Sequence, residues 1–103
     1  MGRQSAPPRR DEILQALRDS QAFRRAFGVV RVSLFGSVAR NEAREDSDVD
    51  LLVEFGRPIG LFEFARPQRE LGERLGRRVE VVTVDALKPR LRDRILREAV
   101  VAA

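Results

Sequence analysis

The chain has 103 residues, of which 43% are apolar, 20 are basic and 16 are acidic, and its formal net charge is +4. This length suits one domain with a modest core. The sequence contains no Cys, His, Tyr or Trp, which excludes disulfides, His- or Cys-ligated zinc, a Cys nucleophile and a Ser-His-Asp triad.

The first residues are the most basic part of the chain. Arg3, Arg9 and Arg10 precede all 16 acidic residues, so the remainder is nearly neutral and we do not expect direct binding to nucleic acid. A polyanion-binding surface between Lys88 and Arg97 remains open, but a solvated helix face is the simpler interpretation. No apolar run is long enough for a membrane span or a signal peptide, so we expect a cytoplasmic protein.

We interpret residues 1–10 as a flexible tail and residues 11–103 as a single domain. The spacing of the apolar residues predicts a first helix over 11–26. Asp11 is a suitable cap at its start, and Gly28 is a suitable end.

Two runs rich in β-branched and aliphatic residues predict strands over 29–35 and 49–55. Between them we expect a short helical turn over 38–42 with Ser37 as its N-cap, followed by a polar loop. The alternation in the second strand places Val49, Leu51 and Val53 on the core side.

The second half of the chain predicts a helix over 61–75, a third strand over 78–84 and a last helix from Pro89 to Val100. Pro67 lies inside the first of these helices, so the helix either begins near Pro67 or is kinked there. This order of elements predicts a small α/β domain in which helices flank a sheet.

Three acidic residues on the predicted strands form a candidate metal site. Asp48 and Asp50 project to the same side because side chains alternate along a strand. Glu80 joins them if its strand pairs with theirs on the matching face. Carboxylates in this arrangement bind Mg²⁺ or Mn²⁺. The alternative is that these acids lie on edge strands and face water.

Gly36 and Ser37 follow the first predicted strand and form a candidate phosphate-binding turn. Gly36 lacks a Cβ, so the backbone can approach a ligand closely, and Ser37 adds a hydroxyl at the start of a helical turn. Arg40 either binds a terminal phosphate or forms a surface ion pair with Glu42 or Glu45.

Two blocks, LFGSVAR over 34–40 and SDVDLLV over 47–53, resemble the minimal nucleotidyltransferases of the polymerase-β-like superfamily, which are marked by Gly-Ser followed by Asp-x-Asp. The similarity continues through 79–83 and the last helix. Two departures are a Glu at position 80, where Asp is common, and Pro67 within a helix that is continuous in relatives.

That resemblance implies a mixed β-sheet flanked by helices, Mg²⁺ and an ATP-type donor. It implies that Gly36 and Ser37 hold the triphosphate. We add Arg40 and Ser47 as nucleotide-binding candidates, although Ser47 most simply caps or orients the loop before Asp48. The residues implied for metal binding and catalysis are Asp48, Asp50 and Glu80. The resemblance also gives Glu80 the role of general base toward an acceptor hydroxyl.

The same resemblance implies a partner. Many single-domain members are antitoxins that transfer AMP to a tyrosine hydroxyl of a HEPN-domain ribonuclease toxin. The chain has no room for an acceptor-binding domain, so we expect the partner protein to supply the acceptor.

Two alternatives stay open. One is an antitoxin that neutralises by occlusion through Leu61, Phe62 and Phe64, although burial of these side chains against the sheet is the simpler interpretation. The other, which the size and charge disfavour, is a transferase acting on small molecules or RNA ends.

Overall fold

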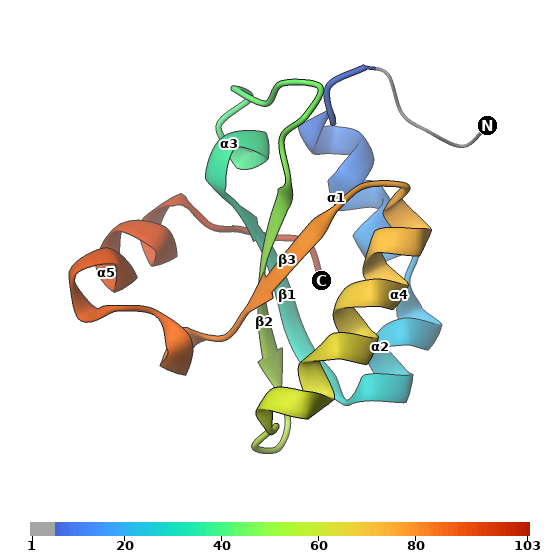
Figure 1. The fold of residues 1–103 in the computed structure, drawn as a ribbon, viewed down its shortest axis with the longest axis vertical. Helices are drawn as coiled ribbons and strands as arrows, with labels where there is room; N and C mark the ends of the chain where they lie inside the picture. The colour runs from blue at the N-terminus through green and yellow to red at the C-terminus, as the bar shows by residue number, and fades with distance from the viewer. Residues whose placement is uncertain (1–5) are drawn as a thin grey trace.

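A four-stranded β-sheet runs through the centre of the molecule, with helices on both sides (Figure 1). This computed structural model describes residues 6–103. The strands, in the order β3-β2-β1-β4 across the sheet, are β1 (Val29–Phe35), β2 (Val49–Phe55), β3 (Val79–Val82) and β4 (Val100–Val101). β1 is antiparallel to β2 and β4, whereas β2 and β3 are parallel. The predicted mixed sheet flanked by helices is confirmed.

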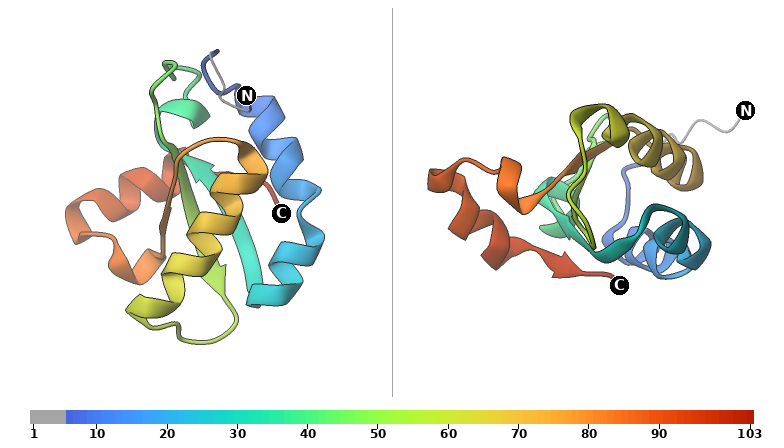
Figure 2. Two further views of the ribbon diagram at one scale, coloured as in Figure 1. Left: turned by 45° about the vertical axis from the view of Figure 1, so that its right-hand side comes forward. Right: turned by 90° about the horizontal axis from the view of Figure 1, so that it is seen from below.

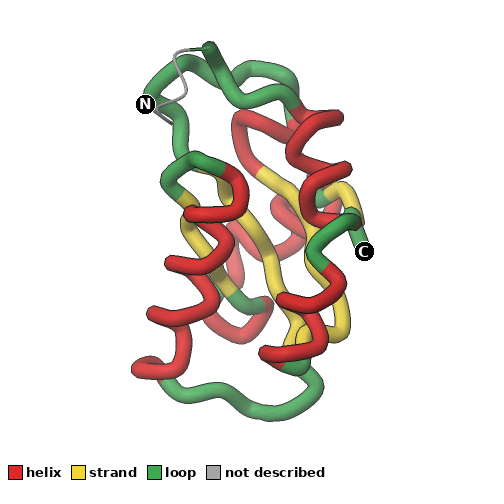
Figure 3. The backbone as a smooth tube through the Cα atoms, turned by 90° about the vertical axis from the view of Figure 1, so that its right-hand side faces the viewer, coloured by secondary structure: helices red, strands yellow, loops and turns green. Residues whose placement is uncertain are grey.

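The helices divide unequally between the two faces of the sheet (Figures 2 and 3). One face is covered by α1 (Arg10–Arg18), α2 (Gln21–Phe27) and α4 (Ala65–Leu75). The other side has α5 (Pro89–Glu98). The short elements are α3 (Gly36–Ala39) and the 3₁₀ turns η1 (Leu61–Phe64) and η2 (Val84–Ala86). No helix within residues 6–103 has the length and apolar character needed to cross a membrane.

The hydrophobic core fills the space between the sheet and the three helices that cover it. Leu51 and Val53 of β2 and Leu34 of β1 are each 0% exposed, and Leu17 of α1 packs into the same core. The strand prediction over 49–55 and its core-facing positions are confirmed. Burial of side chains of this size stabilises the fold by roughly 1.5–3 kcal/mol each.

The prediction of one helix over 11–26 is wrong, because the segment forms α1 and α2 with a break between them. Side chains bind the backbone carbonyls that a continuous helix would use. The Ser20 hydroxyl donates to the carbonyl of Ala16 at 2.7 Å, and the Arg24 guanidinium donates to that of Leu17 at 2.6 Å. Such bonds compete with the helical pattern and end α1.

The first helix also begins earlier than predicted. Its N-cap is Arg9, so Asp11 lies within the first turn instead of capping it. Pro8, in the predicted tail, is buried, and residues 1–5 lie outside the described residues. Gly28 ends α2 in the left-handed conformation at φ +65°, as predicted.

The later boundaries differ in three places, the first being the third strand, which was predicted over 78–84 but covers only Val79–Val82. α4 begins at Ala65 after η1, so Pro67 lies in its first turn and the alternative of a kink is wrong. The last helix ends at Glu98 instead of Val100. The residues after it form β4, which the sequence analysis missed because two residues are too few to show a strand pattern.

Candidate active site

Two of the three candidate carboxylates are direct neighbours on the sheet. In the parallel pairing of β2 with β3, Asp50 lies opposite Glu80, and in the antiparallel pairing with β1 it lies opposite Phe35. Because Leu51 and Val53 face the core, Asp50 faces the other side, where α5 lies. The predicted pairing of the Glu80 strand on the matching face is confirmed.

Gly36 is required by the position of Asp50. Its φ is +77°, and a Cβ there would overlap Oδ2 of Asp50. The group that approaches this glycine closely is the Asp50 carboxylate, and the close approach to a ligand stays a prediction. Any larger residue would push this carboxylate away from its place beside the turn.

The turn itself is shorter than predicted. α3 runs from Gly36 to Ala39 with Phe35 as its N-cap, so the expectation that Ser37 caps a turn over 38–42 is wrong. Ser37 is half-buried in the first turn. Its hydroxyl makes no hydrogen bond to any residue that the structure describes, so it is free to donate to a ligand.

The electrostatic environment of Asp50 disfavours its ionised form. Burial, together with the nearby charges of Glu80 and Asp48, raises the pKa of Asp50 from 3.8 to about 6, while the positive charge of Arg40 opposes the shift. A partly buried carboxylate among like charges is the kind of group that a divalent cation neutralises. The donor set of carboxylate oxygens fits Mg²⁺ or Mn²⁺.

The side chain of Asp48 is paired with a basic residue. It lies just before β2, and its Oδ1 is 3.1 Å from Nε of Arg78. Within residues 6–103, no three acidic side chains stand close enough together to hold a metal ion. The structure thus brings Asp50 and Glu80 together, while Asp48 is paired with Arg78.

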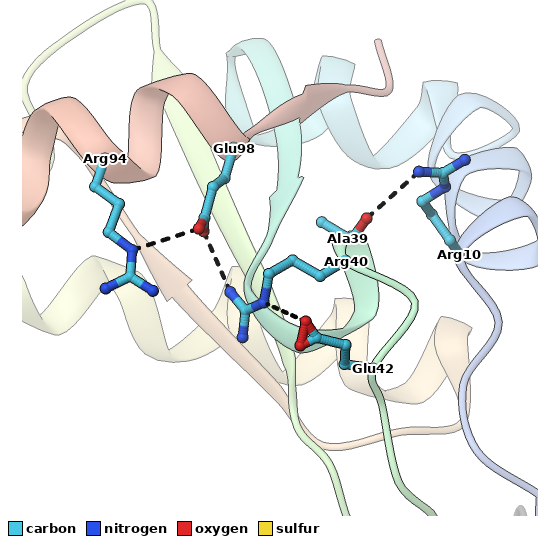
Figure 4. Close-up of polar contacts among 6 residues, drawn as sticks. All are labelled: Arg10, Ala39, Arg40, Glu42, Arg94 and Glu98. Atoms are coloured by element: carbon cyan, nitrogen blue, oxygen red, sulfur yellow. Dashed lines mark hydrogen bonds and ion pairs between the residues drawn. The ribbon is translucent and has the colours of Figure 1, made fainter.

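Arg40 forms the ion pair with Glu42 that the sequence analysis considered, at 3.3 Å from its Nε. It also pairs with Glu98 at the end of α5, at 3.2 Å from its Nη1 (Figure 4). The sequence analysis did not predict Glu98 as a partner of Arg40. The signal that could have pointed to it was an acidic residue at the C-terminal end of an otherwise basic helix. Ser47 Oγ accepts a hydrogen bond from the amide of Arg44 at 2.7 Å, which supports its predicted role in the loop.

This arrangement matches a known family. A model of the nucleotidyltransferase domain matches residues 13–102. The chain belongs to this family. The match extends from α1 to the residues after β4, so it includes both Gly36–Ser37 and the three candidate acids, and the chain is a nucleotidyltransferase.

One solved relative of this nucleotidyltransferase is described as being of the minimal type. A solved structure described as a candidate minimal nucleotidyltransferase is 49% identical, covers 86% of this chain and 92% of its own, and superposes with a TM-score of 0.73. A protein of Methanocaldococcus jannaschii, named as a candidate protein adenylyltransferase, is 53% identical over 73 residues, which is 71% of this chain and 78% of the relative.

Two further similarities concern a named protein adenylyltransferase and a toxin–antitoxin structure. The protein adenylyltransferase MntA of Thermococcus cleftensis is 43% identical over 77 residues, covering 75% of this chain and 78% of the relative. A toxin–antitoxin structure with AMP-PNP shares the fold, with a TM-score of 0.68 at 18% identity over 91% of this chain and 72% of that one.

Proposed function

We propose that this nucleotidyltransferase is an antitoxin that transfers AMP from ATP to a tyrosine hydroxyl of a partner HEPN-type ribonuclease toxin. The observation that carries the proposal is the position of Asp50, which lies directly beside Gly36 and opposite Glu80 of the neighbouring strand. The name of the Thermococcus relative, a protein adenylyltransferase, supports this choice of reaction. The toxin–antitoxin structure with AMP-PNP supports the choice of partner and of nucleotide.

The metal in this proposal is Mg²⁺ or Mn²⁺, held by Asp48, Asp50 and Glu80. When bound, it neutralises charge on the phosphates and makes an attacking hydroxyl more acidic. Asp48 must leave Arg78 to take part. The Arg78 side chain is 79% exposed. Because an exposed ion pair contributes only about 0–1 kcal/mol, loss of the Asp48–Arg78 pair would destabilise the protein little.

The nucleotide phosphates lie along the turn after β1. The free hydroxyl of Ser37 donates to a phosphate oxygen, and Gly36 keeps the turn close to Asp50. Arg40 adds positive charge on the same side. Ser47 acts less directly, by holding the loop that leads to Asp48.

The transfer step follows from these positions. The tyrosine oxygen attacks the α-phosphorus of ATP and forms a new P–O bond, while the bond from that phosphorus to pyrophosphate breaks. The hydroxyl proton passes to Glu80, which is exposed on the open side of the sheet. Pyrophosphate leaves, and AMP remains on the tyrosine as a phosphodiester.

A labelling experiment tests this proposal. The chain is incubated with Mg²⁺, ATP labelled at the α-phosphate and the protein encoded by the neighbouring gene. We expect label on a tyrosine of that protein, located by mass spectrometry, and background labelling with the Asp48→Asn/Asp50→Asn variant. Labelling by the wild type that stays at background and matches that of the variant rules out transfer to that partner.

A second candidate function is neutralisation by occlusion, without catalysis. Exposed apolar side chains favour a protein contact: Leu91 and Leu96 of α5 are 45% and 43% exposed, and Val101 of β4 is 54% exposed. Phe64 is instead partly buried against the core, and the side chains of Leu61 and Phe62 lie outside the described residues.

Growth rescue separates the two functions. Occlusion predicts that the Asp48→Asn/Asp50→Asn variant protects cells from the toxin as well as the wild type does. Transfer predicts that protection is lost while the variant remains folded.

A further inference from the structure

We infer that Glu98, at the end of α5, is a positioning residue that holds Arg40 in place for the phosphates of the nucleotide. This inference rests on the proposed function, because it assigns a partner to one of the proposed nucleotide-binding residues. Its basis is a contact between residues 58 positions apart, in which Nη1 of Arg40 lies 3.2 Å from Oε2 of Glu98 (Figure 4).

The sheet fixes Glu98 beside Arg40. Two residues after Glu98, β4 begins with Val100, which pairs with Leu34 of β1. β1 in turn runs directly into Gly36 and α3, whose C-cap is Arg40. Both partners are therefore anchored to adjacent strands, so their contact does not depend on loop geometry.

The charge of Glu98 is unfavourable for its own helix. An acidic side chain in the last helical turn lies next to the negative end of the helix dipole. It is balanced by Arg94, whose Nε lies 3.4 Å from Oε1 of Glu98, and by Arg40. The Glu98 side chain is 26% exposed, against 60% for Glu42, so it is the more sheltered of the two acids that pair with Arg40.

Arg40 keeps free donors while it is held. A guanidinium has five N–H groups, and Glu42 and Glu98 use only Nε and Nη1. Within the described part of the chain, Nη2 of Arg40 has no hydrogen-bond partner. A side chain already fixed by two carboxylates loses less conformational freedom when it binds a phosphate, which strengthens binding.

Nucleotide affinity tests this inference. We would titrate the full chain with AMP-PNP in the presence of Mg²⁺ and measure Kd by calorimetry. Arg40→Ala should weaken binding about 10- to 100-fold, the value of a charged hydrogen bond. Glu98→Gln should weaken it about 3- to 5-fold. The Arg40→Ala/Glu98→Gln double variant should bind AMP-PNP no more weakly than Arg40→Ala alone, because Glu98 acts through Arg40.

The matched control is Glu63→Gln. It removes the acid from another exposed ion pair, in which Nη2 of Arg57 lies 3.0 Å from Oε2 of Glu63, and it should leave Kd unchanged. Glu98→Asp, which keeps the charge with a shorter reach, gives a second measurement if Glu98→Gln unfolds; it should also weaken binding. Unchanged or tighter binding by the Glu98 variants, or additive losses in the double variant, overturns the inference while the proposed function stands. Failure of the wild type to bind AMP-PNP overturns both.

Discussion

The two faces of the sheet contrast sharply, although they are made by the same strands. On the face covered by α1, α2 and α4, the side chains of Leu34, Leu51 and Val53 are 0% exposed. On the other face, the alternate positions of β2 and β3 carry Asp50 and Glu80 side by side. One face thus supplies the stability of the fold, and the other loses stability by placing acidic side chains together where we propose that a nucleotide and a metal bind.

Among substitutions on the two faces, the largest expected effect is the loss of catalysis when an acid of the charged face is replaced. Asp50→Asn removes the candidate metal ligand that lies beside Gly36 and opposite Glu80, so we expect transfer to fall by about 10³-fold, or roughly 4 kcal/mol. The rate of α-phosphate label transfer measures it. Asp46→Asn, an exposed acid in the preceding loop, is the control and should transfer at the wild-type rate.

On the covered face, Leu51→Ala should lower the free energy of unfolding by about 2–5 kcal/mol, because it leaves a cavity in the core. Leu96→Ala, on the exposed side of α5, should change it by less than about 0.5 kcal/mol. Urea denaturation compares the two variants. Similar losses at both positions would mean that α5 is packed as tightly as the core.

The turn between β1 and α3 joins the two faces, and Gly36→Ala sharpens its role. A Cβ there would overlap the Asp50 carboxylate, and φ is +77°. We therefore expect the free energy of unfolding, measured by thermal denaturation, to fall by about 2–4 kcal/mol. Gly28→Ala is the control, because φ is +65° but no atom lies within 4 Å of its Cβ. It should lose only about 1 kcal/mol, and equal losses would show that the contact with Asp50 is unimportant.

The smallest expected effect is on pH dependence. The folded-state pKa of Asp50 is raised to about 6 from 3.8, so between these values the folded chain binds more protons than the unfolded chain. The free energy of unfolding without metal should therefore fall as pH rises from about 4 to about 6, by on the order of 1 kcal/mol after solvent screening.

Urea midpoints in EDTA at pH 4.5 and 7 measure this change for the wild type and for Asp50→Asn. The variant should lack the Asp50 contribution and be the more stable of the two at pH 7. A wild type that gains stability relative to the variant as pH rises would contradict the assignment.

Sequence patterns were sufficient where one residue type has one strong local consequence. Alternation identified Val49, Leu51 and Val53 as core residues, and the conformational freedom of glycine identified Gly28 as the end of a helix. The break after α1 was missed because Ser20 and the guanidinium of Arg24 end the helix through side-chain bonds that apolar spacing does not reveal.

Tertiary contacts account for the rest of what was missed. Glu98 reaches Arg40 only because β4 lies beside β1, and β4 is too short to be seen as a strand in the sequence. Likewise, the side chain of Asp48 turns toward Arg78. A local pattern fixes which side of a strand a residue faces, but not which distant cation it meets.

The strand order has a consequence for how the molecule assembles. β1 and β2 are consecutive and antiparallel, β3 arrives only after the α4 crossover, and β4 returns from the end of the chain to pair with β1. Closing longer loops is entropically harder, so we expect the β1–β2 hairpin to form first and β4 last. Glu80 and Glu98 would then reach the site only in the late stages of folding. The proposed nucleotide affinity should therefore appear during refolding only when the sheet has fully formed.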